Sequence, residues 1–314
     1  MFSKGYSIAL IASQLLLGMT VSLGSNDSLA KQEPSPQPYS QSYPQPHPKR
    51  IITLAPHLSE LVDAAGGAER LVSVSAFSNL PESVKQLPIT SDARSIDLEK
   101  MKSLRPDLII YWRGGISESQ IQSIKKTFNK DVQFISVQPK KLSDIAIDIE
   151  TIGKALGTET IAKKNADALR LKITELSTKQ QSKKQQSTDQ KNTSERKVRV
   201  FYQVWAQPLM TLNQDHIIGD IIQRCGGEQL FANEKVLVPT VSREAVIKAN
   251  PEIIFTAVDS TKMNTDWSMW SSFPQLAATK NKAFIDLDGD IISRPSPRIM
   301  QGAQKICAEI NKVR

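Results

Sequence analysis

One sequence pattern occurs in both halves of this chain, and it restricts the possible folds more than any other feature. The first copy runs from Glu99 to Ile110 and the second from Glu244 to Phe255, and in each a proline follows the glutamate after seven residues. The residue before a proline avoids helical geometry, and a short apolar run after it is typical of a buried strand. Each copy therefore predicts a short helix that leads into a buried strand.

The rest of each half alternates strands and helices in the same order. In the first half, the β-rich run 51–54 precedes an amphipathic helix that ends at Gly66. In the second half, the strand 198–202 precedes a helix over 217–222, which ends before Gly226. Strands that alternate with helices predict parallel sheets covered by helices. We therefore expect an α/β fold of two related, Rossmann-like lobes.

A long helical region separates the two halves. One apolar stripe covers 145–156, a second covers 162–176, and Gly157 lies between them. A helix of about 20 residues in the second stripe spans about 30 Å, which is enough to join two lobes. The expected organisation is an N-terminal lobe over 50–157, a bridging backbone helix with a basic extension over 158–195, and a C-terminal lobe over 196–314.

The N-terminal residues have the features of an export signal followed by a linker. Lys4 precedes an apolar stretch, and small residues before Ala30 form a cleavage site. These features predict a secretory signal peptide over 1–30, cleaved near Ala30. A membrane anchor is the alternative, but the stretch is shorter than the ~20 apolar residues that a spanning helix needs. Alternating prolines make 31–49 a Pro-rich linker that cannot form a packed core.

The chain has a formal net charge of +8. A basic protein can bind a polyanion, but whether this one does depends on where the charges lie. Seven Lys and Arg residues but only two acidic residues lie between 178 and 199, interleaved with Gln, Ser and Thr. Such a segment is typical of a solvated extension of a helix, and it has no aromatic side chain on which bases stack. We therefore expect no nucleic acid partner.

The cysteines and histidines favour structural roles. An even pair in an exported protein predicts a disulfide between Cys225 and Cys307. A thiol nucleophile or metal ligand is the alternative, although neither cysteine has a CxxC partner. His57 and His216, one in each half, have no metal-binding spacing, and the chain contains no GxSxG motif or phosphate-binding glycine loop. We expect neither a metal site nor an enzyme.

Four short segments are distinctive when taken together. They are Phe-Ser-Asn-Leu-Pro at 77–81, Trp-Arg-Gly-Gly at 112–115, Val-Ser-Arg-Glu at 241–244 and Ser-Pro-Arg-Ile at 296–299. With the cysteine pair, they resemble the periplasmic cobalamin (vitamin B12)-binding proteins of ABC importers, which are helical-backbone (class III) substrate-binding proteins. The resemblance covers about 50–314 and implies that ligand binds in a cleft between two lobes that move little.

The resemblance also implies a function without chemistry. The protein would be a monomer when free in the periplasm, bind cobalamin or a related corrinoid as transported ligand rather than as cofactor, and deliver it to an ABC permease. In the family, the position of Phe77 is a ligand-contacting Tyr, and the segment 290–294 is a cleft loop before the last helix. The residues implied to bind ligand are Phe77, Trp112, Arg113, Gly114, Trp205, Asp290, Ile291, Ile292, Ser293 and Arg294.

Glu99 and Glu244 occupy equivalent points of the two repeats. The resemblance implies that each docks into an arginine pocket of the permease dimer, with one contact per lobe. A carboxylate that accepts a bidentate arginine has suitable geometry and charge for this role. The alternative is a glutamate that complements the dipole at a helix N-terminus, worth about 0.3–1 kcal/mol.

Other functions remain as alternatives. Three aromatic positions of the family are Ala93, Val204 and Val238 here. A ferric siderophore or haem is the alternative ligand within the same transporter class. A haem carrier needs an axial His or Tyr facing the cleft and a siderophore carrier needs several cations, whereas we expect Arg113 and Arg294 there but no histidine. An exported hydrolase and a cell-envelope interaction protein are the alternatives from other classes, and no nucleophile–base motif supports the first.

Overall fold

The structure is a computed structural model that describes residues 47–128, 132–185, 196–259 and 265–314. The expected signal peptide, the Pro-rich linker up to residue 46 and the basic residues 186–195 lie outside the described ranges. Within those ranges, no helix combines the length and apolar character that crossing a membrane requires.

The first half forms a five-stranded parallel sheet, which defines the N-lobe. Its strands are β1 (Ile51–Thr53), β2 (Leu71–Ser75), β3 (Ile89–Ser91), β4 (Leu108–Trp112) and β5 (Gln133–Val137), in the order β3-β2-β1-β4-β5. The helices of this lobe are α1 (Pro56–Ala64), α2 (Leu98–Ser103) and α3 (Glu118–Thr127), with short 3₁₀ turns at Ala68–Arg70 and Glu82–Gln86.

Alternate residues of the central N-lobe strands pack on opposite faces of the sheet. Ile51 and Ile110 belong to the core that includes α1, whereas Ile52 and Ile109 pack with Met101 of α2 and with α3. A strand buried on both faces is expected to be apolar at every position, which explains why β4 has an unbroken apolar sequence.

The second half forms a four-stranded parallel sheet, which defines the C-lobe. Its strands are β6 (Val198–Gln203), β9 (Gly227–Gln229), β10 (Ile253–Val258) and β11 (Phe284–Asp288), in the order β11-β10-β6-β9, and a hairpin of β7 (Trp205–Ala206) and β8 (Leu209–Met210) follows β6. Helices α6 (Ile217–Arg224) and α11 (Ile299–Val313) pack on one face of the sheet. Helices α7 (Arg243–Ala249), α8 (Ser268–Ser271) and α9 (Ala277–Lys280) pack on the other, and the one-turn helix α10 (Gly289–Ile292) follows β11.

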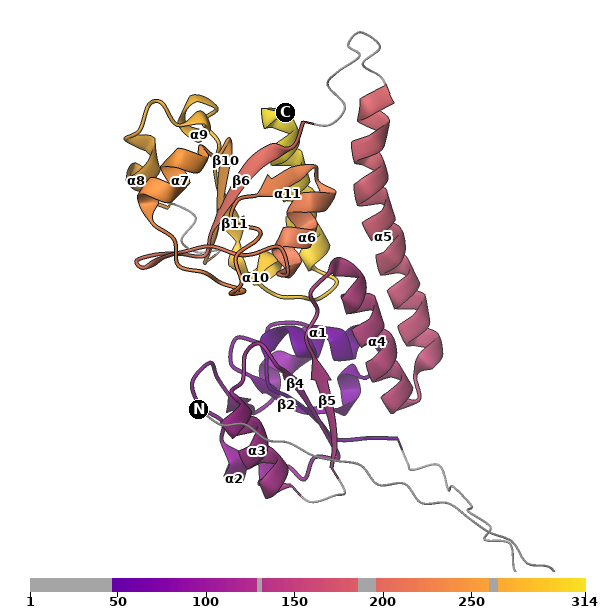
Figure 1. The fold of residues 1–314 in the computed structure, drawn as a ribbon. Helices are drawn as coiled ribbons and strands as arrows, with labels where there is room; N and C mark the ends of the chain where they lie inside the picture. The colour runs from indigo at the N-terminus through magenta and orange to yellow at the C-terminus, as the bar shows by residue number, and fades with distance from the viewer. Residues whose placement is uncertain (1–46, 129–131, 186–195, 260–264) are drawn as a thin grey trace, which may run out of the picture. The chain divides into compact units, whose positions relative to one another are not determined.

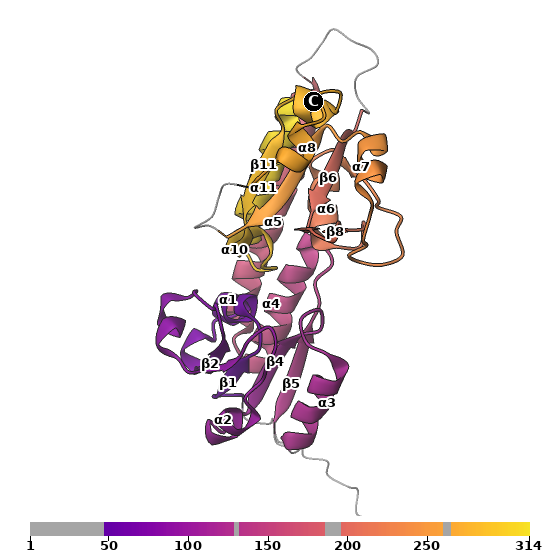
Figure 2. The same cartoon turned by 90° about the vertical axis from the view of Figure 1, so that its left-hand side faces the viewer.

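Two long helices connect the lobes (Figures 1 and 2). They are α4 (Leu142–Leu156) and α5 (Glu159–Gln185), and α5 contacts α1 of the N-lobe and α11 of the C-lobe. Gly157 joins them with a φ of 68°, a left-handed conformation that glycine adopts without strain. At 1.5 Å per residue, α5 is about 40 Å long, because the helix continues past 176 into the basic stretch.

The repeated pattern forms the predicted unit in both lobes. Helix α2 leads into β4, and α7 leads into β10. In each copy the residue before the proline has a positive φ, 46° at Arg105 and 50° at Asn250, which ends the helix and turns the chain into the strand. The two α/β lobes joined by a backbone helix are therefore confirmed.

A disulfide joins Cys225, at the end of α6, to Cys307 in α11, as the sequence predicts. Both sulfurs are buried in the C-lobe core, and the bridge closes a sequence separation of 82 residues.

Replacing both cysteines by alanine should lower the free energy of unfolding by about 2–5 kcal/mol, because the unfolded chain regains the freedom that the bridge removes. Guanidinium unfolding of the oxidised protein measures this difference. The native protein under reducing conditions is the control and should match the variant. Equal stability of the variant and the oxidised native protein would contradict the prediction.

Candidate functional site

The carboxyl ends of the parallel strands line an interlobe cleft. Residues that directly follow β1 to β5 of the N-lobe lie on one side, and residues that follow β6 and β11 of the C-lobe lie on the other. Parallel strands all end at the same edge of a sheet, where α/β proteins bind ligands. Two cavities lie in this cleft among the described residues, a smaller one of about 370 Å³ and a larger one of about 560 Å³.

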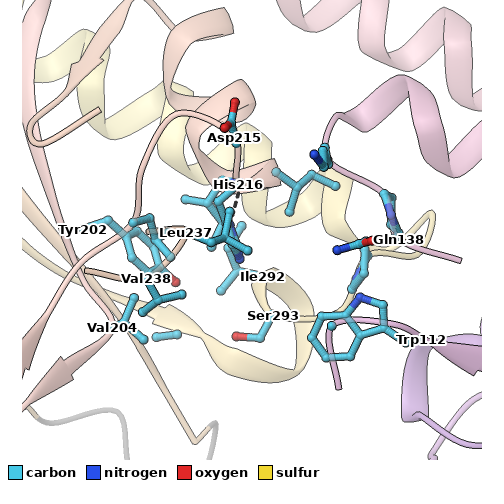
Figure 3. Close-up of a pocket in the computed structure, with 18 residues that line it drawn as sticks. Trp112, Gln138, Tyr202, Val204, Asp215, His216, Leu237, Val238, Ile292 and Ser293 are labelled. Carbon is cyan, nitrogen blue, oxygen red and sulfur yellow. Dashed lines mark hydrogen bonds between the residues drawn. The ribbon is translucent and has the colours of Figure 1, made fainter. Parts of the chain in front are cut away.

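The smaller cavity is enclosed mainly by apolar side chains of both lobes (Figure 3). Trp112 and Gln138 of the N-lobe face Tyr202 and Val238 of the C-lobe across it. Its remaining walls include Gly114, Val204, Leu212, His216, Leu237, Ala257, Ile292 and Ser293, and its charged members are Lys140 and Asp215. An apolar cavity with a few polar groups is the usual form of a small-molecule site.

The larger cavity adjoins the smaller one, because Trp112 and Ser293 line both. Its other walls include His57, Phe77, Asp92, Ala93, Gly115, Asp290 and Arg294. Phe77 is 79% exposed and has a φ of 65°. A positive φ is unusual for a bulky residue, so the backbone holds this ring at the rim at some cost in strain.

Trp112, which lines both cavities, is held in place by close contacts with its indole. The His57 ring packs edge-on against it, with centroids 5.4 Å apart. Gly114 and Gly115 turn around the indole so closely that a Cβ at Gly114 would lie 2.7 Å from it, and one at Gly115 would also overlap it. Only glycine permits this approach, which explains the Gly-Gly pair after β4.

His57 lines the larger cavity and His216 lines the smaller one. The expectation that the cleft contains no histidine is therefore wrong. Burial, and secondarily the charge of Arg294, lowers the pKa of His57 to about 3, and its Nε2 has no hydrogen-bond partner among the described residues. Burial lowers the pKa of His216 to about 4, and its Nδ1 accepts the Ile218 N–H at 3.2 Å (Figure 3). The neutral His216 ring therefore carries its proton on Nε2 and can donate it.

A sequence signal for these histidines existed. His57 lies in the first turn of α1 and His216 is the N-cap of α6, so each begins the first helix of its lobe. The search for metal-binding spacing misses them, because that spacing concerns two ligands on one helix rather than single residues on two lobes. Within the described ranges, no three His, Cys, Asp or Glu side chains converge in a way that could hold a metal ion.

The structure separates the ten predicted ligand-binding residues into two groups. Seven line a cavity, namely Phe77, Trp112, Gly114, Asp290, Ile292, Ser293 and Arg294. Arg113, Ile291 and Trp205 line neither cavity, and the exposed Trp205 indole donates to the Gln207 carbonyl at 2.8 Å. The segment 290–294, expected as a loop, begins within α10 because the Asp288 carboxylate accepts the Asp290 N–H and caps a helical turn.

Arg294 and Asp290 form an ion pair in the wall of the larger cavity, with Nη2 and Oδ1 2.6 Å apart. The arginine side chain is largely buried. A buried guanidinium needs such partners, and protein carboxylates compensate the charge of this one.

Glu99 and Glu244 have equivalent positions in α2 and α7. Each is the second residue of its helix, after an N-cap that accepts a backbone N–H, and both side chains are largely exposed. Backbone and Ser242 hydrogen bonds lower the pKa of Glu244. The two carboxylates thus project from matching places on the two lobes.

Comparison with known proteins gives a consistent result. The sequence profile of the periplasmic binding protein family matches residues 51–291. The vitamin B12-binding protein of Vibrio cholerae is 30% identical over 259 residues, which cover 82% of this chain and 88% of that protein. The crystal structure of the periplasmic vitamin B12 binding protein of Vibrio cholerae has a TM-score of 0.73 at 29% identity and covers 85% of this chain and 98% of that one. A periplasmic heme-binding protein from Roseiflexus shares the fold, with a TM-score of 0.70 at 18% identity, covering 85% of this chain and 99% of that one.

Replacing His57 by glutamine should flatten the dependence of stability on pH. Between its folded pKa of about 3 and its ordinary value of 6.5, the unfolded chain binds a proton that the folded protein does not, so acidification destabilises the native protein. Between pH 6.5 and 4.5, the variant should lose about 2 kcal/mol less unfolding free energy than the native protein. Guanidinium unfolding at each pH measures this. His47→Gln, at an exposed histidine, is the control, and parallel profiles for His57→Gln and the native protein would contradict the prediction.

Proposed function

The chain belongs to the periplasmic binding protein family, and on this premise we propose that it captures cobalamin or a related corrinoid in the interlobe cleft and delivers it to an ABC permease. The family consists of solute-binding proteins of the periplasm, which are not enzymes. The same proposal assigns residues 1–30 to a signal peptide cleaved near Ala30 and treats the free protein as a monomer.

One observation carries the choice of ligand. Both cavities meet at Trp112, an aromatic side chain between two lobes, in a chain 30% identical to vitamin B12-binding proteins. A corrinoid is a large macrocycle edged with amide side chains, so it needs both an apolar surface and scattered polar groups. The smaller cavity supplies the apolar surface, and Gln138, His216 and Ser293 supply amide, imidazole and hydroxyl groups at its wall.

Three aliphatic residues modify the expected contacts. Ala93 lines the larger cavity, and Val204 and Val238 line the smaller one. These side chains preserve an apolar wall but remove rings that would stack on a macrocycle. We therefore infer that Trp112 and Phe77 carry most of the aromatic contact with the ligand.

Haem is the second candidate, because metal-ligating side chains lie in the cleft walls. His57, Tyr202 and His216 line the two cavities, and imidazole and phenol groups are axial ligands of haem iron. Coordination of haem would shift its visible spectrum, which distinguishes it from simple adsorption.

Calorimetric titration of the mature protein with cyanocobalamin, cobinamide, haem and a ferric siderophore tests the ligand. We expect binding of a corrinoid, and Trp112→Ala should weaken it at least about tenfold by removing the aromatic side chain that lines both cavities. Trp205→Ala is the matched control, with an expected effect within about twofold, because that indole lines neither cavity. Binding of haem alone, with a spectral shift lost in His57→Ala or His216→Ala, would replace the corrinoid by haem.

Charge reversal at the docking positions tests delivery. Glu99→Lys and Glu244→Lys should abolish corrinoid uptake into cells that depend on this protein while leaving affinity unchanged, since neither residue lines the cleft. Glu118→Lys is the control, because Glu118 is also an exposed first-turn glutamate, on α3, and its reversal costs the same dipole interaction. Loss of affinity in the first two variants, or equal loss of uptake in all three, would refute the docking role.

A further inference from the structure

A buried carboxylate of the N-lobe has its polar side-chain partners, among the described residues, in the C-lobe. Glu60 lies in the middle of α1 and is 7% exposed. Its Oε1 accepts a hydrogen bond from Arg298 Nη2 at 2.6 Å, and its Oε2 accepts one from Ser296 Oγ at 2.6 Å. Arg294 Nη1 lies 3.9 Å from the same Oε1. Because an unpaired buried charge is strongly unfavourable, the N-lobe depends on the C-lobe to compensate this one.

A second N-lobe residue contacts the same arginines. The Asn79 Oδ1 accepts from Arg294 Nη1 at 2.8 Å and from Arg298 Nη2 at 3.2 Å, and its Nδ2 donates to Asp290 Oδ2 at 3.3 Å. The N-lobe carboxylate of Glu60 and the C-lobe carboxylate of Asp290 thus balance the two C-lobe guanidinium groups of this network. We call this group the interlobe clamp; it comprises Glu60, Asn79, Asp290, Arg294, Ser296 and Arg298.

Part of the interlobe clamp lines the cleft, and the rest contacts those lining residues without reaching the cavities. Arg294 and Asp290 line the larger cavity, whereas Glu60 and Arg298 line neither cavity. The groups that face a ligand are therefore oriented by groups that do not touch it.

Small movements between the lobes would break this arrangement. Hydrogen bonds weaken steeply once their donor and acceptor separate or tilt, and in a buried network each broken bond leaves a poorly solvated charge. We propose that Glu60 and Arg298 are positioning residues that fix the width of the cleft and the orientation of Arg294 and Asp290, so that the site is formed before ligand enters. The effect on affinity rests on the proposed function, whereas the effect on cleft width does not.

Glu60→Gln and its matched control Glu252→Gln separate positioning from general stability. Glu252 is also buried and pairs with two arginines, Arg196 at 2.6 Å and Arg199 at 3.5 Å, but entirely within the C-lobe. Both variants remove one buried charge, so both should be less stable than the native protein. Glu60→Gln should also raise the corrinoid dissociation constant at least about fivefold, and Glu252→Gln should change it less than about twofold.

The width of the cleft is measured without ligand. The disulfide leaves no free thiol among the described residues, so Lys126→Cys on α3 and Lys248→Cys on α7 provide spin-label sites, one on each lobe. Electron–electron double resonance should give a broader or longer distance distribution for Glu60→Gln than for the native protein and Glu252→Gln. Asn79→Ala, which leaves Glu60 paired, provides the same test if Glu60→Gln does not fold.

An unchanged distance distribution in the Glu60 and Asn79 variants would overturn the proposal. Equal losses of affinity in Glu60→Gln and Glu252→Gln would also overturn it, because the effect would then be one of stability. Should the native protein bind no corrinoid, the proposed ligand would be wrong, but the distance measurement would still decide whether the interlobe clamp sets the cleft.

Discussion

A single apolar core connects the two lobes through α4 and α5, and the geometry of the cleft depends on it. Ala162, Ala166, Leu169, Ile173 and Leu176 of α5 belong to the same buried cluster as α1 of the N-lobe and as α6 and α11 of the C-lobe. Burying one such leucine or isoleucine stabilises a protein by about 1.5–3 kcal/mol, whereas an exposed ion pair such as Lys163–Asp167 contributes about 0–1 kcal/mol. The shared core, rather than surface charge, therefore opposes separation of the lobes.

This core also determines where chemistry can be brought together. It covers one face of each sheet, so the edge at which the parallel strands end remains available. Segments far apart in sequence meet there, among them His57 after β1, Trp112 at the end of β4 and Ser293 after β11. The interlobe clamp also joins distant segments, because Arg298 donates a hydrogen bond to Glu60 although the two residues are 238 positions apart in sequence.

The sequence predicted those helices and strands of this protein that depend on interactions between neighbouring residues. The repeat around Glu99 and Glu244 identified two related lobes, because apolar periodicity and proline act on neighbouring residues. The cleft was harder to predict, because adjacent residues at a strand end point to opposite sides. Trp112 therefore lines both cavities while Arg113, next to it, lines neither. The pairing of Glu60 with Ser296 and Arg298 could not be predicted, because it depends on how two separately specified lobes meet.

The balance of charge in the cleft bears on its ligand more than the count of arginines does. The charged residues that line the two cavities are Lys140, Arg294, Asp92, Asp215 and Asp290, so acids outnumber bases among them. Arg294 is paired with Asp290 and also lies near Glu60, so it presents little uncompensated charge to the cavity. Anionic ligands, such as ferric catecholate siderophores or the propionates of haem, would gain little electrostatic attraction in such a site. The neutral amide groups of a corrinoid exchange hydrogen bonds without opposing this charge, so the charge balance favours the proposed corrinoid over an anionic ligand.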